Sequence, residues 1–358
     1  MYSDLTTLCV TLDHTFNEAV AQMDRSRLGI VLVVDDDRRL VGTLTDGDVR
    51  RAILARVDLT TPVGILLSMK SGTRYARPIT ASVGEDPVTY LSLLKQHSVL
   101  HLPLLDEDQR VVGLVRMEDF VPSEPLSLQA VVMAGGQGSR LSPLTDELPK
   151  PMLPVGDRPL MEIVLQRLRE AGITQVTVAT HHKPEKIEEY FGQGAAHGID
   201  LSYIAEDRPL GTAGALGLLG SPKETTLVMN GDILTQVDFR AMLAYHREHQ
   251  ADLTVAVRYY DLEVPYGVVE CEGHIVRRLR EKPSMGFFIN AGIYLLEPTA
   301  YRFIPNAQRF DMTDLIQRLL DAGRPVVSFP VREYWLDIGR HADYAQAQEH
   351  VKQGDIKV

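Results

Sequence analysis

Short runs of apolar, largely β-branched residues recur along this chain, and polar turns separate them. In the first third, the runs at 31–34 and 102–105 are each followed by an aspartate, and further runs follow at 40–44 and 110–114. Apolar runs of this length between Asp-rich turns predict β-strands. We therefore expect two pairs of strands in this region.

The two strand pairs belong to an internal repeat with an offset of 71 residues. Gly42 aligns with Gly113, and Asp48 aligns with Asp119. Each copy predicts a helix, a strand, an acidic turn, a second strand and a second helix. A repeat of one such unit indicates two similar subdomains packed together.

Beyond residue 128, apolar strands alternate with helical segments. Positions 160, 163, 164 and 168 are apolar at helical spacing, and Gly172 marks the end of that helix. The strand segments are apolar throughout, which indicates a sheet buried on both faces. We expect a Rossmann-like α/β domain that closes with a helix at 342–351. The expected strands are 130–134, 175–180, 201–204 and 226–229, and the other expected helices are 160–171 and 184–191.

A glycine-rich turn directly follows the first strand of this second region. Its residues of interest are Ala134, Gly135, Gly136 and Gly138. Arg140 and Lys150 follow closely, so backbone N–H groups and fixed cations can face phosphates together. Residue 141 is leucine, which breaks the dinucleotide fingerprint, and Lys150 is too distant for a Walker loop. The pattern predicts a protein that handles a nucleoside triphosphate.

Length and composition favour two domains. The chain has 358 residues, of which 44% are hydrophobic, and this exceeds what one typical core needs. Two prolines, at 122 and 125, interrupt any periodicity and mark a boundary. We expect a first module at 1–122, a linker at 123–127 and a second domain at 128–358.

Charge and cysteine content narrow the partners and the location. The net charge of −11 disfavours nucleic acid as a partner. Cys9 and Cys271 form no pattern typical of a disulfide framework or a thiolate metal site. No apolar run approaches the roughly 20 residues that span a bilayer, and the chain starts with no secretory leader. We expect a cytoplasmic protein that does not associate with membranes.

The segment 42–50 reads Gly-Thr-Leu-Thr-Asp-Gly-Asp-Val-Arg and resembles the end of a CBS domain. With the repeat, residues 3–122 resemble a tandem CBS pair, or Bateman module. The resemblance implies that Thr45 and Asp48 hydrogen-bond the ribose and phosphate region of a regulatory adenine nucleotide. The alternative is that these two residues only cap the helix that follows them.

The second copy departs from the CBS pattern. Arg116 replaces the hydroxyl residue while Asp119 remains. The resemblance then implies a cleft that is altered, filled by the arginine itself, or selective for a more phosphorylated ligand. CBS pairs commonly associate with one another, so we also expect a homodimer formed through this module, by analogy.

The second domain resembles the sugar-phosphate nucleotidyltransferases, which implies a GT-A-like α/β fold. The resemblance extends from residue 128 to about 342 and rests on motifs that occur in the family's order. These motifs lie at 134–145, 149–155, 209–216, 230–232, 266–267, 281–283, 290–294 and 335–339.

The chemistry of this family explains the charged residues in the motifs. A sugar 1-phosphate is already largely a dianion at neutral pH, so it needs no general base to act as a nucleophile. The difficulty is to bring it to the α-phosphate of a polyanion, which requires charge neutralisation and alignment. The resemblance implies that Asp232 and Asp337 hold Mg²⁺. It also implies that Arg140, Lys150 and Asp232 are catalytic.

The same resemblance assigns residues to the sugar phosphate. Lys282 corresponds to the lysine that binds the phosphate of the sugar, and Glu281 to an acceptor of sugar hydroxyls. Gly267 and Asn290 are expected to line the same pocket.

The choice of base depends on the segment 206–212, which includes Glu206, Gly211 and Thr212. Guanine presents two adjacent donors and a carboxylate only accepts, so Glu206 favours guanine if it faces the base. The expected reaction is GMP transfer from GTP to a sugar 1-phosphate. Uridylyl or thymidylyl transfer is the alternative within this fold. A catalytically silent protein that senses a nucleotide or an activated sugar is the alternative from another class.

Overall fold

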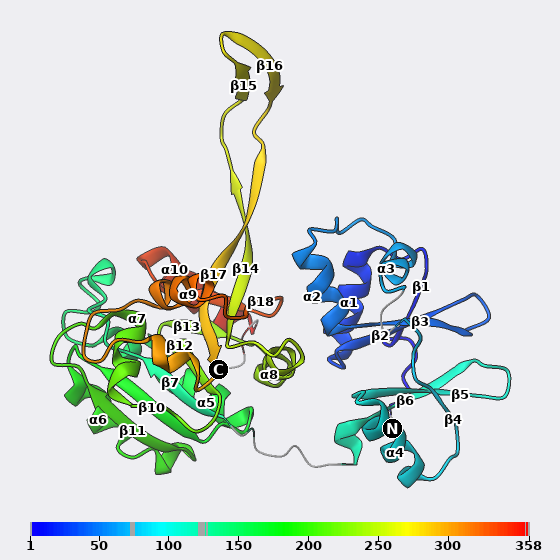
Figure 1. The fold of residues 1–358 in the computed structure, drawn as a ribbon, viewed down its shortest axis with the longest axis horizontal. Helices are drawn as coiled ribbons and strands as arrows, with labels where there is room; N and C mark the ends of the chain where they lie inside the picture. The colour runs from blue at the N-terminus through cyan, green and yellow to red at the C-terminus, as the bar shows by residue number, and fades with distance from the viewer. Residues whose placement is uncertain (1, 72–75, 121–125, 127, 355, 357–358) are drawn as a thin grey trace. The chain divides into compact units, whose positions relative to one another are not determined.

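The structure is a computed structural model, and it describes residues 2–71, 76–120, 126, 128–354 and 356. The chain divides into two compact units, residues 1–124 and 125–358, whose elements Figure 1 labels. The linker predicted at 123–127 lies outside the described residues except for Leu126. Among the helices described, none is long and apolar enough to cross a membrane.

The N-terminal unit contains two three-stranded sheets of the same topology. Its elements are β1 (Cys9–Thr11), α1 (Phe16–Ser26), β2 (Ile30–Val34), β3 (Leu40–Thr45), α2 (Asp46–Leu54), α3 (Val63–Met69), β4 (Ala81–Ser82), α4 (Pro87–His97), β5 (His101–Leu105) and β6 (Val111–Arg116). β1 and β4 pair parallel with β2 and β5, which pair antiparallel with β3 and β6. The register shifts between Val33 and Val34 and again between Leu104 and Leu105, which are 71 residues further on. The two sheets therefore have the topology that the repeat predicts.

The two copies differ in the helix that follows their last strand. α2 has nine residues, whereas a 3-10 turn of three residues, Met117–Asp119, follows β6. The second helix expected in this copy is therefore only a single turn within the described residues.

His101 in β5 makes the stability of the N-terminal unit depend on pH. Burial lowers the pKa of its imidazole from 6.5 to about 4. The unfolded chain therefore binds this proton more tightly than the folded protein does. The stabilising contribution is complete above about pH 6.5 and is lost as pH falls toward 4.

We expect His101→Gln to flatten this pH dependence between pH 6.5 and 4. Hydrogen exchange of the β5 amides in the full chain, in a urea series at both pH values, measures the effect. His97→Gln, at the exposed end of α4, is the matched control and should retain the wild-type pH dependence. Equal pH dependence in both variants would rule out His101 as the titrating group.

The C-terminal unit is built on a mixed seven-stranded sheet. Its helices are α5 (Leu160–Glu170), α6 (Pro184–Phe191), α7 (Gly211–Gly214), α8 (Phe239–Glu248), α9 (Met312–Asp321) and α10 (His341–Gln353). Its strands are β7 (Gln129–Met133), β8 (Pro154–Val155), β9 (Arg158–Pro159), β10 (Gln175–Thr180), β11 (Asp200–Ala205), β12 (Thr226–Asn230), β13 (Ile233–Thr235), β14 (Leu253–Glu263), β15 (Val268–Glu272), β16 (Ile275–Arg280), β17 (Ser284–Leu296), β18 (Val326–Pro330) and β19 (Trp335–Asp337). The strand order is β11-β10-β7-β12-β17-β14-β18, and β17 runs antiparallel to both of its neighbours.

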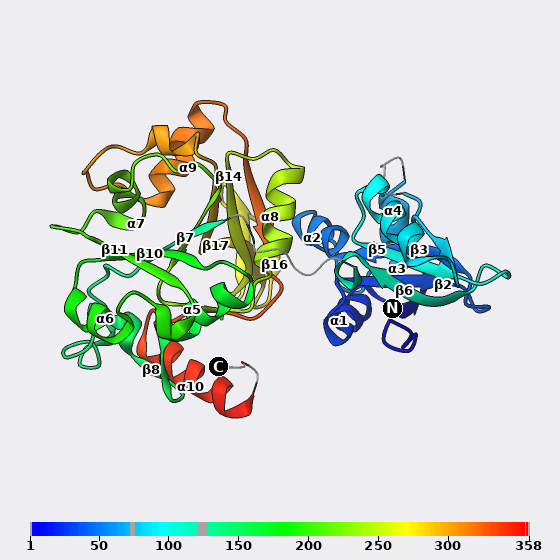
Figure 2. The ribbon, with the colours of Figure 1, turned by 90° about the horizontal axis from the view of Figure 1, so that it is seen from below.

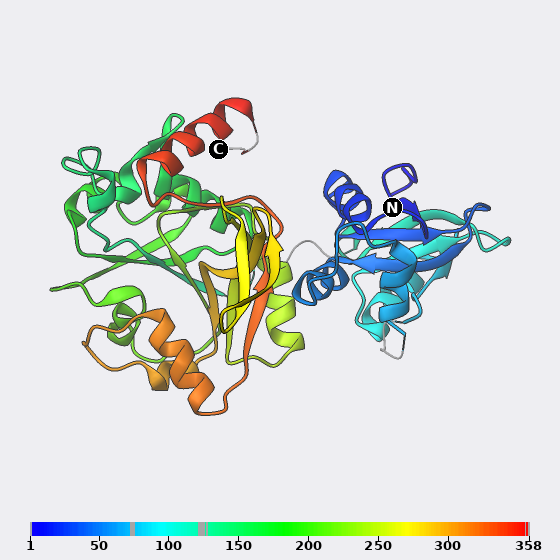
Figure 3. The ribbon, with the colours of Figure 1, turned by 90° about the horizontal axis from the view of Figure 1, so that it is seen from above.

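Hydrophobic cores lie on both faces of this sheet. Along β7, Ala130 and Val132 pack into a core with α5, α6 and α8, whereas Val131 between them packs with α9 on the other face. Figure 2 shows α5 and α6 on one side of the sheet and α7 and α9 on the other, and Figure 3 shows the same layers from above. The expected α/β fold with a doubly covered sheet is confirmed.

Two strands of the sheet extend far beyond it. β14 has 11 residues and β17 has 13, whereas β18 pairs only with Leu253–Val257 at the start of β14. The outer parts of β14 and β17 pair with each other, and the β15–β16 hairpin forms their end. Figure 1 shows this segment as a ribbon that projects from the C-terminal unit. We call residues 258–289 the arm.

Candidate active site

Two aspartates distant in sequence meet at the carboxyl edge of the central strands. Asp232 follows β12, and Asp337 ends β19. β19 pairs antiparallel with β13, so that Asp337 lies opposite Ile233. The Ile338 N–H donates to the Asp232 carbonyl at 3.0 Å. The backbone thus holds the two carboxylates as neighbours, which is the arrangement that a shared divalent cation needs.

Lys150 forms an ion pair with one oxygen of Asp232. Its ammonium group donates to Asp232 Oδ2, and only 7% of the Lys150 surface is exposed. Asp232 Oδ1 is buried and has no hydrogen-bond partner. A buried acceptor without a partner is costly. A carboxylate oxygen is also the ligand type that Mg²⁺ prefers. The donor set therefore fits a magnesium ion at this position.

Asp337 is influenced by Asp232, Lys150 and Arg140 at this edge and, more weakly, by Asp343. Partial burial and repulsion from Asp232 raise its pKa, and Lys150 and Arg140 act against that rise. The Arg140 guanidinium is also close to the turn after β19, because a Cβ on Gly339 would lie 3.7 Å from it. The structure brings together Arg140, Lys150, Asp232 and Asp337. Within the described residues there is no cluster of three or more metal-ligating side chains.

The glycine turn after β7 packs closely against its surroundings. A Cβ on Gly135 would lie 2.8 Å from Glu206 Oε1, and one on Gly138 would lie 2.9 Å from the Thr145 side chain. Gly138 also has a φ of +65°, which glycine adopts without strain. Gly136 has open space where its side chain would be. Buried Ala134 donates its N–H to the Ala179 carbonyl at 2.8 Å and anchors the turn to β10.

Glu206 is held beside the glycine turn with 7% of its surface exposed. The side-chain oxygen Oε2 of Glu206 accepts a hydrogen bond from the Leu210 N–H at 2.8 Å. The backbone carbonyl of Glu206 accepts one from His181 Nδ1 at 2.8 Å. Burial raises the pKa of Glu206. His181 was not among the predicted site residues, and its only signal in the sequence is its position directly after a predicted strand.

Gly211 and Thr212 are bound to the start of α9. A Cβ on Gly211 would lie 2.5 Å from Asp311 Oδ1, and its φ is +82°. The Thr212 N–H donates to Asp311 Oδ1 at 2.9 Å, and the Thr212 hydroxyl accepts from the Met312 N–H at 2.8 Å. The N–H and the hydroxyl of Thr212 are thus hydrogen-bonded to the first residues of α9 and its cap. Asp311 was missed in the sequence, although Asp three residues before Asp314 is a recognisable capping pattern.

The four residues expected in one sugar pocket are separated in the single chain. Asn290 lies at the base of the arm and accepts the Gly292 N–H at 2.9 Å. Gly267, Glu281 and Lys282 lie on the arm, where a Cβ on Gly267 would be 3.3 Å from Glu281 Oε2. The lengths of β14 and β17 explain the separation, since these strands carry the segment between them out of the sheet.

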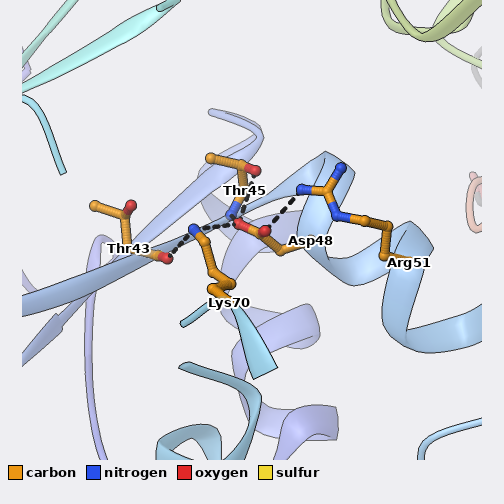
Figure 4. Close-up of polar contacts among 5 residues, drawn as sticks. All are labelled: Thr43, Thr45, Asp48, Arg51 and Lys70. Carbon is orange, nitrogen blue, oxygen red and sulfur yellow. Dashed lines mark hydrogen bonds and ion pairs between the residues drawn. The ribbon is translucent and has the colours of Figure 1, made fainter. Parts of the chain in front are cut away.

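In the N-terminal unit, Asp48 is surrounded by donors (Figure 4). The Thr45 N–H and hydroxyl both donate to Asp48 Oδ2 at 2.9 Å, which forms a capping box at the start of α2. Lys70 donates to the same oxygen at 2.8 Å and to the Thr43 carbonyl at 3.0 Å, and Arg51 donates to Asp48 Oδ1 at 2.8 Å. Burial opposes ionisation of Asp48, but Lys70 and these hydrogen bonds outweigh it and lower its pKa.

The second copy shows a similar arrangement with an arginine. The Arg116 N–H and guanidinium both donate to Asp119 at 3.1 Å, and the guanidinium also pairs with Glu118. Arg116 and Asp119 thus bind each other at the start of the 3-10 turn, and the three alternatives for the second cleft stay predictions. Lys70 of the first copy had no signal in the sequence, since it reaches Asp48 from the end of α3, 22 residues away.

The structure is that of an α/β protein with two carboxylates and two cations at the carboxyl edge of its central strands. A family model for nucleotidyl transferases matches residues 129–354, and the chain belongs to this family. A CBS domain model matches residues 3–55, so a CBS domain precedes the transferase domain.

Several curated proteins are about one third identical to this chain over the residues that align with it. It is 33% identical over 251 residues to a UTP–glucose-1-phosphate uridylyltransferase of Synechocystis sp., covering 64% of this chain and 65% of that protein. It is also 33% identical over 235 residues to a mannose-1-phosphate guanylyltransferase of Mycobacterium tuberculosis. That alignment covers 63% of this chain and 65% of that protein. A D-glycero-alpha-D-manno-heptose 1-phosphate guanylyltransferase of Aneurinibacillus thermoaerophilus is 33% identical over 229 residues, covering 63% and 99%. The chain thus spans about 65% of the length of the first two.

Crystal structures show the same fold. A Bacillus anthracis protein in complex with sucrose aligns with a TM-score of 0.53 at 24% identity, covering 65% of this chain and 97% of that one. HddC from Yersinia pseudotuberculosis aligns with a TM-score of 0.50 at 24% identity, covering 62% and 99%. At this level of identity the likeness concerns the fold alone.

Proposed function

We propose that this protein transfers a nucleotidyl group from a nucleoside triphosphate to a sugar 1-phosphate. An oxygen of the sugar phosphate forms a bond to the α-phosphorus, the bond from that phosphorus to the bridging oxygen breaks, and pyrophosphate leaves. The observation that carries the proposal is the meeting of Asp232 and Asp337 beside Lys150 and Arg140. Membership of the nucleotidyl transferase family supports it.

Asp232 and Asp337 are the residues that would hold Mg²⁺. The partnerless Oδ1 of Asp232 and the raised pKa of Asp337 both indicate a place where negative charge lacks compensation. A bound Mg²⁺ supplies neutralisation of charge on the triphosphate. These two carboxylates suit its preference for few protein ligands.

The other residues of the site position and neutralise the phosphates. The open space at Gly136 lets the triphosphate approach the backbone of the turn. Lys150 lies beneath the turn, since a Cβ on Gly138 would be 3.2 Å from its Cβ, and its ammonium can approach the α-phosphate. Arg140, which is exposed at the rim, can stabilise the departing pyrophosphate. No side chain needs to act as a general base, because the nucleophile is already an anion.

We further propose that GTP is the nucleotide. Glu206 is buried beside Gly135 and offers a carboxylate, which accepts hydrogen bonds from donors such as the N1–H and amino group of guanine. Guanylyltransferases are among the similar proteins, but a uridylyltransferase is equally similar in sequence. Uridylyl or thymidylyl transfer is therefore the alternative that the experiment must separate.

Pyrophosphate release tests the proposal directly. The full chain with Mg²⁺ is incubated with each of the four NTPs and a panel of sugar 1-phosphates, and the mass of each product is determined. We expect pyrophosphate and an NDP-sugar, with GTP as the preferred donor. If no combination of NTP and sugar 1-phosphate releases pyrophosphate, the transferase proposal is overturned. A preference for UTP or dTTP overturns the choice of base.

We also propose that the N-terminal unit binds a regulatory nucleotide through Thr45 and Asp48 only when Lys70 moves away from Asp48. Lys70 and Arg51 already occupy both carboxylate oxygens, so a ribose hydroxyl must displace an ammonium. The apparent affinity for the nucleotide is then the intrinsic affinity multiplied by the fraction of molecules in which the site is open.

Lys70→Met is accordingly expected to tighten nucleotide binding about tenfold, or by about 1.4 kcal/mol. Calorimetric titration of the full chain with AMP, ATP and GTP measures the change. Lys95→Met, on the exposed surface of α4, is the control and should bind as the wild type does. Weaker binding in Lys70→Met would show that Lys70 contacts the ligand instead of blocking it.

A further inference from the structure

The two cations of the proposed site lie on segments with little regular structure. Arg140 belongs to a 3-10 turn of three residues, Ser139–Leu141, and Lys150 begins a second one, Lys150–Met152. Lys150 is bound to Asp232. Among the described residues, by contrast, the Arg140 guanidinium has no hydrogen bond or ion pair. The position of Arg140 therefore depends on what holds the backbone of its turn.

The C-terminal helix α10 contacts this turn through its first residue. His341 begins α10 four residues after Asp337, and its Nε2 lies 2.9 Å from the Ser142 carbonyl oxygen. A carbonyl oxygen only accepts, so the imidazole carries a proton on Nε2 and donates it. Ser142 directly follows the turn of Arg140. The hydrogen bond thus joins the start of α10 to the end of that turn.

Two further polar side chains of α10 lie on the same face as His341. Tyr344 and Gln348 donate to the Pro154 carbonyl at 2.5 and 2.7 Å, and Gln348 Oε1 accepts the Gly156 N–H at 3.1 Å. Positions 341, 344 and 348 have the spacing that places side chains on one face of a helix. Figure 2 shows α10 beside β8, which begins two residues after the turn of the other cation. The helix therefore contacts that segment as well.

Apolar packing joins the same segments. Leu141, Ile338 and Ala347 are buried in one core. Leu141 is the residue after Arg140, Ile338 is the residue after Asp337, and Ala347 belongs to α10. One helix is thus in contact with the segments of both cations and of one carboxylate.

We propose that His341 is a positioning residue for Arg140. It acts through the Ser142 carbonyl, which it holds so that the guanidinium stays at the rim of the site. This inference rests on the proposed transferase function. Because the packing of Leu141 also holds the turn, loss of one hydrogen bond loosens Arg140 without releasing it. The expected loss of turnover is therefore about fivefold, which is far less than the loss expected when the guanidinium itself is removed.

His341→Ala is expected to lower kcat by about fivefold with KM unchanged, as measured by steady-state pyrophosphate release. The side chain is exposed, so the thermal unfolding midpoint should stay close to that of the wild type. His341→Gln should recover most of kcat, because its amide nitrogen can donate to the same carbonyl. Wild-type kcat in His341→Ala, or an equal loss in His341→Gln, overturns the proposal.

The matched control is His249→Ala. His249 is also exposed, and its Nδ1 donates to one backbone carbonyl, that of Tyr245, at 2.9 Å at the end of α8. The control therefore removes a bond of the same kind from another part of the unit. It should retain both kinetic parameters.

A double-mutant cycle shows whether His341 acts through Arg140. In the Arg140→Ala background, His341→Ala should have no further effect on kcat, because no guanidinium remains to be positioned. A labelled NTP makes the low turnover of this background measurable. A fivefold loss that persists there would show that His341 acts on another part of the site, and this overturns the assignment.

Hydrogen exchange tests the anchoring without any need for turnover. The amides of residues 141–146 in the full chain should exchange faster in His341→Ala than in the wild type, and at the wild-type rate in His249→Ala. Equal exchange in His341→Ala and the wild type overturns the anchoring. A wild type that releases no pyrophosphate counts against the transferase function only, because exchange still tests the contact of α10 with this turn.

Discussion

Asp232→Asn is expected to lower turnover by about 10³-fold, the loss that follows when about 4 kcal/mol of transition-state stabilisation is removed. The substitution removes a charge that Asp232 shares between Lys150 and the divalent ion it would hold. Pyrophosphate release at saturating substrates measures the effect. Asp321→Asn, at the exposed end of α9, is the control and should retain full activity.

A folding defect must be separated from this loss of catalysis. Lys150 is buried, and an ammonium left without its partner costs several kcal/mol. Asp337→Asn provides the second variant, because Asp337 is only partly buried and the ion pair of Lys150 is made with Asp232. It should lose activity with the thermal unfolding midpoint unchanged, and Mn²⁺ binding followed by electron paramagnetic resonance should weaken in both variants. Full activity in Asp337→Asn would contradict the shared-cation site.

Arg140→Ala is expected to lower kcat by about 10³-fold with little change in KM, by analogy with arginines that act on transferring phosphoryl groups. The guanidinium is exposed and close to Gly339, so its removal creates no buried cavity and should leave stability unchanged. Steady-state kinetics with the preferred NTP separate the two parameters. Arg140→Lys should recover part of kcat, because it keeps the charge without the planar fork.

The control for Arg140 is Arg167→Ala, which removes a surface ion pair with Glu170 on α5. It should leave both kinetic parameters unchanged. A variant at Arg140 that raises KM and leaves kcat intact would show that this arginine binds the ground state and the transition state equally.

The regular elements of the C-terminal unit could be read from periodicity. The strand at 175–180 and the helix at 184–191 were predicted with the bounds that the structure shows. The apolar positions of each segment follow the pattern of a single type of element, and a proline marks the start of the helix. The arm was not predicted, because short segments of mixed apolar and polar residues such as 258–263 and 284–289 also occur in strands that stay within a sheet. Nothing local distinguishes a strand that packs on its own domain from one that extends beyond it.

The two aspartates illustrate what sequence motifs add to periodicity. Asp232 and Asp337 are 105 residues apart, and only the ordered motifs of the family suggested that they meet. Lys70 had no such motif, and its contact with Asp48 depends on how α3 packs against β3. Residues that act through tertiary packing alone could not be predicted in this way.

The unequal ends of the two N-terminal copies bear on how many nucleotides the module would take if it binds them as proposed above. A tandem duplication begins with two equivalent clefts and thus with a stoichiometry of two per chain. Here α2 presents a nine-residue helix dipole beside Asp48, whereas Met117–Asp119 is too short to build one beside Asp119. The copies therefore differ at the element whose dipole would favour an anionic ligand. Saturation with one nucleotide per chain is the outcome that this asymmetry favours.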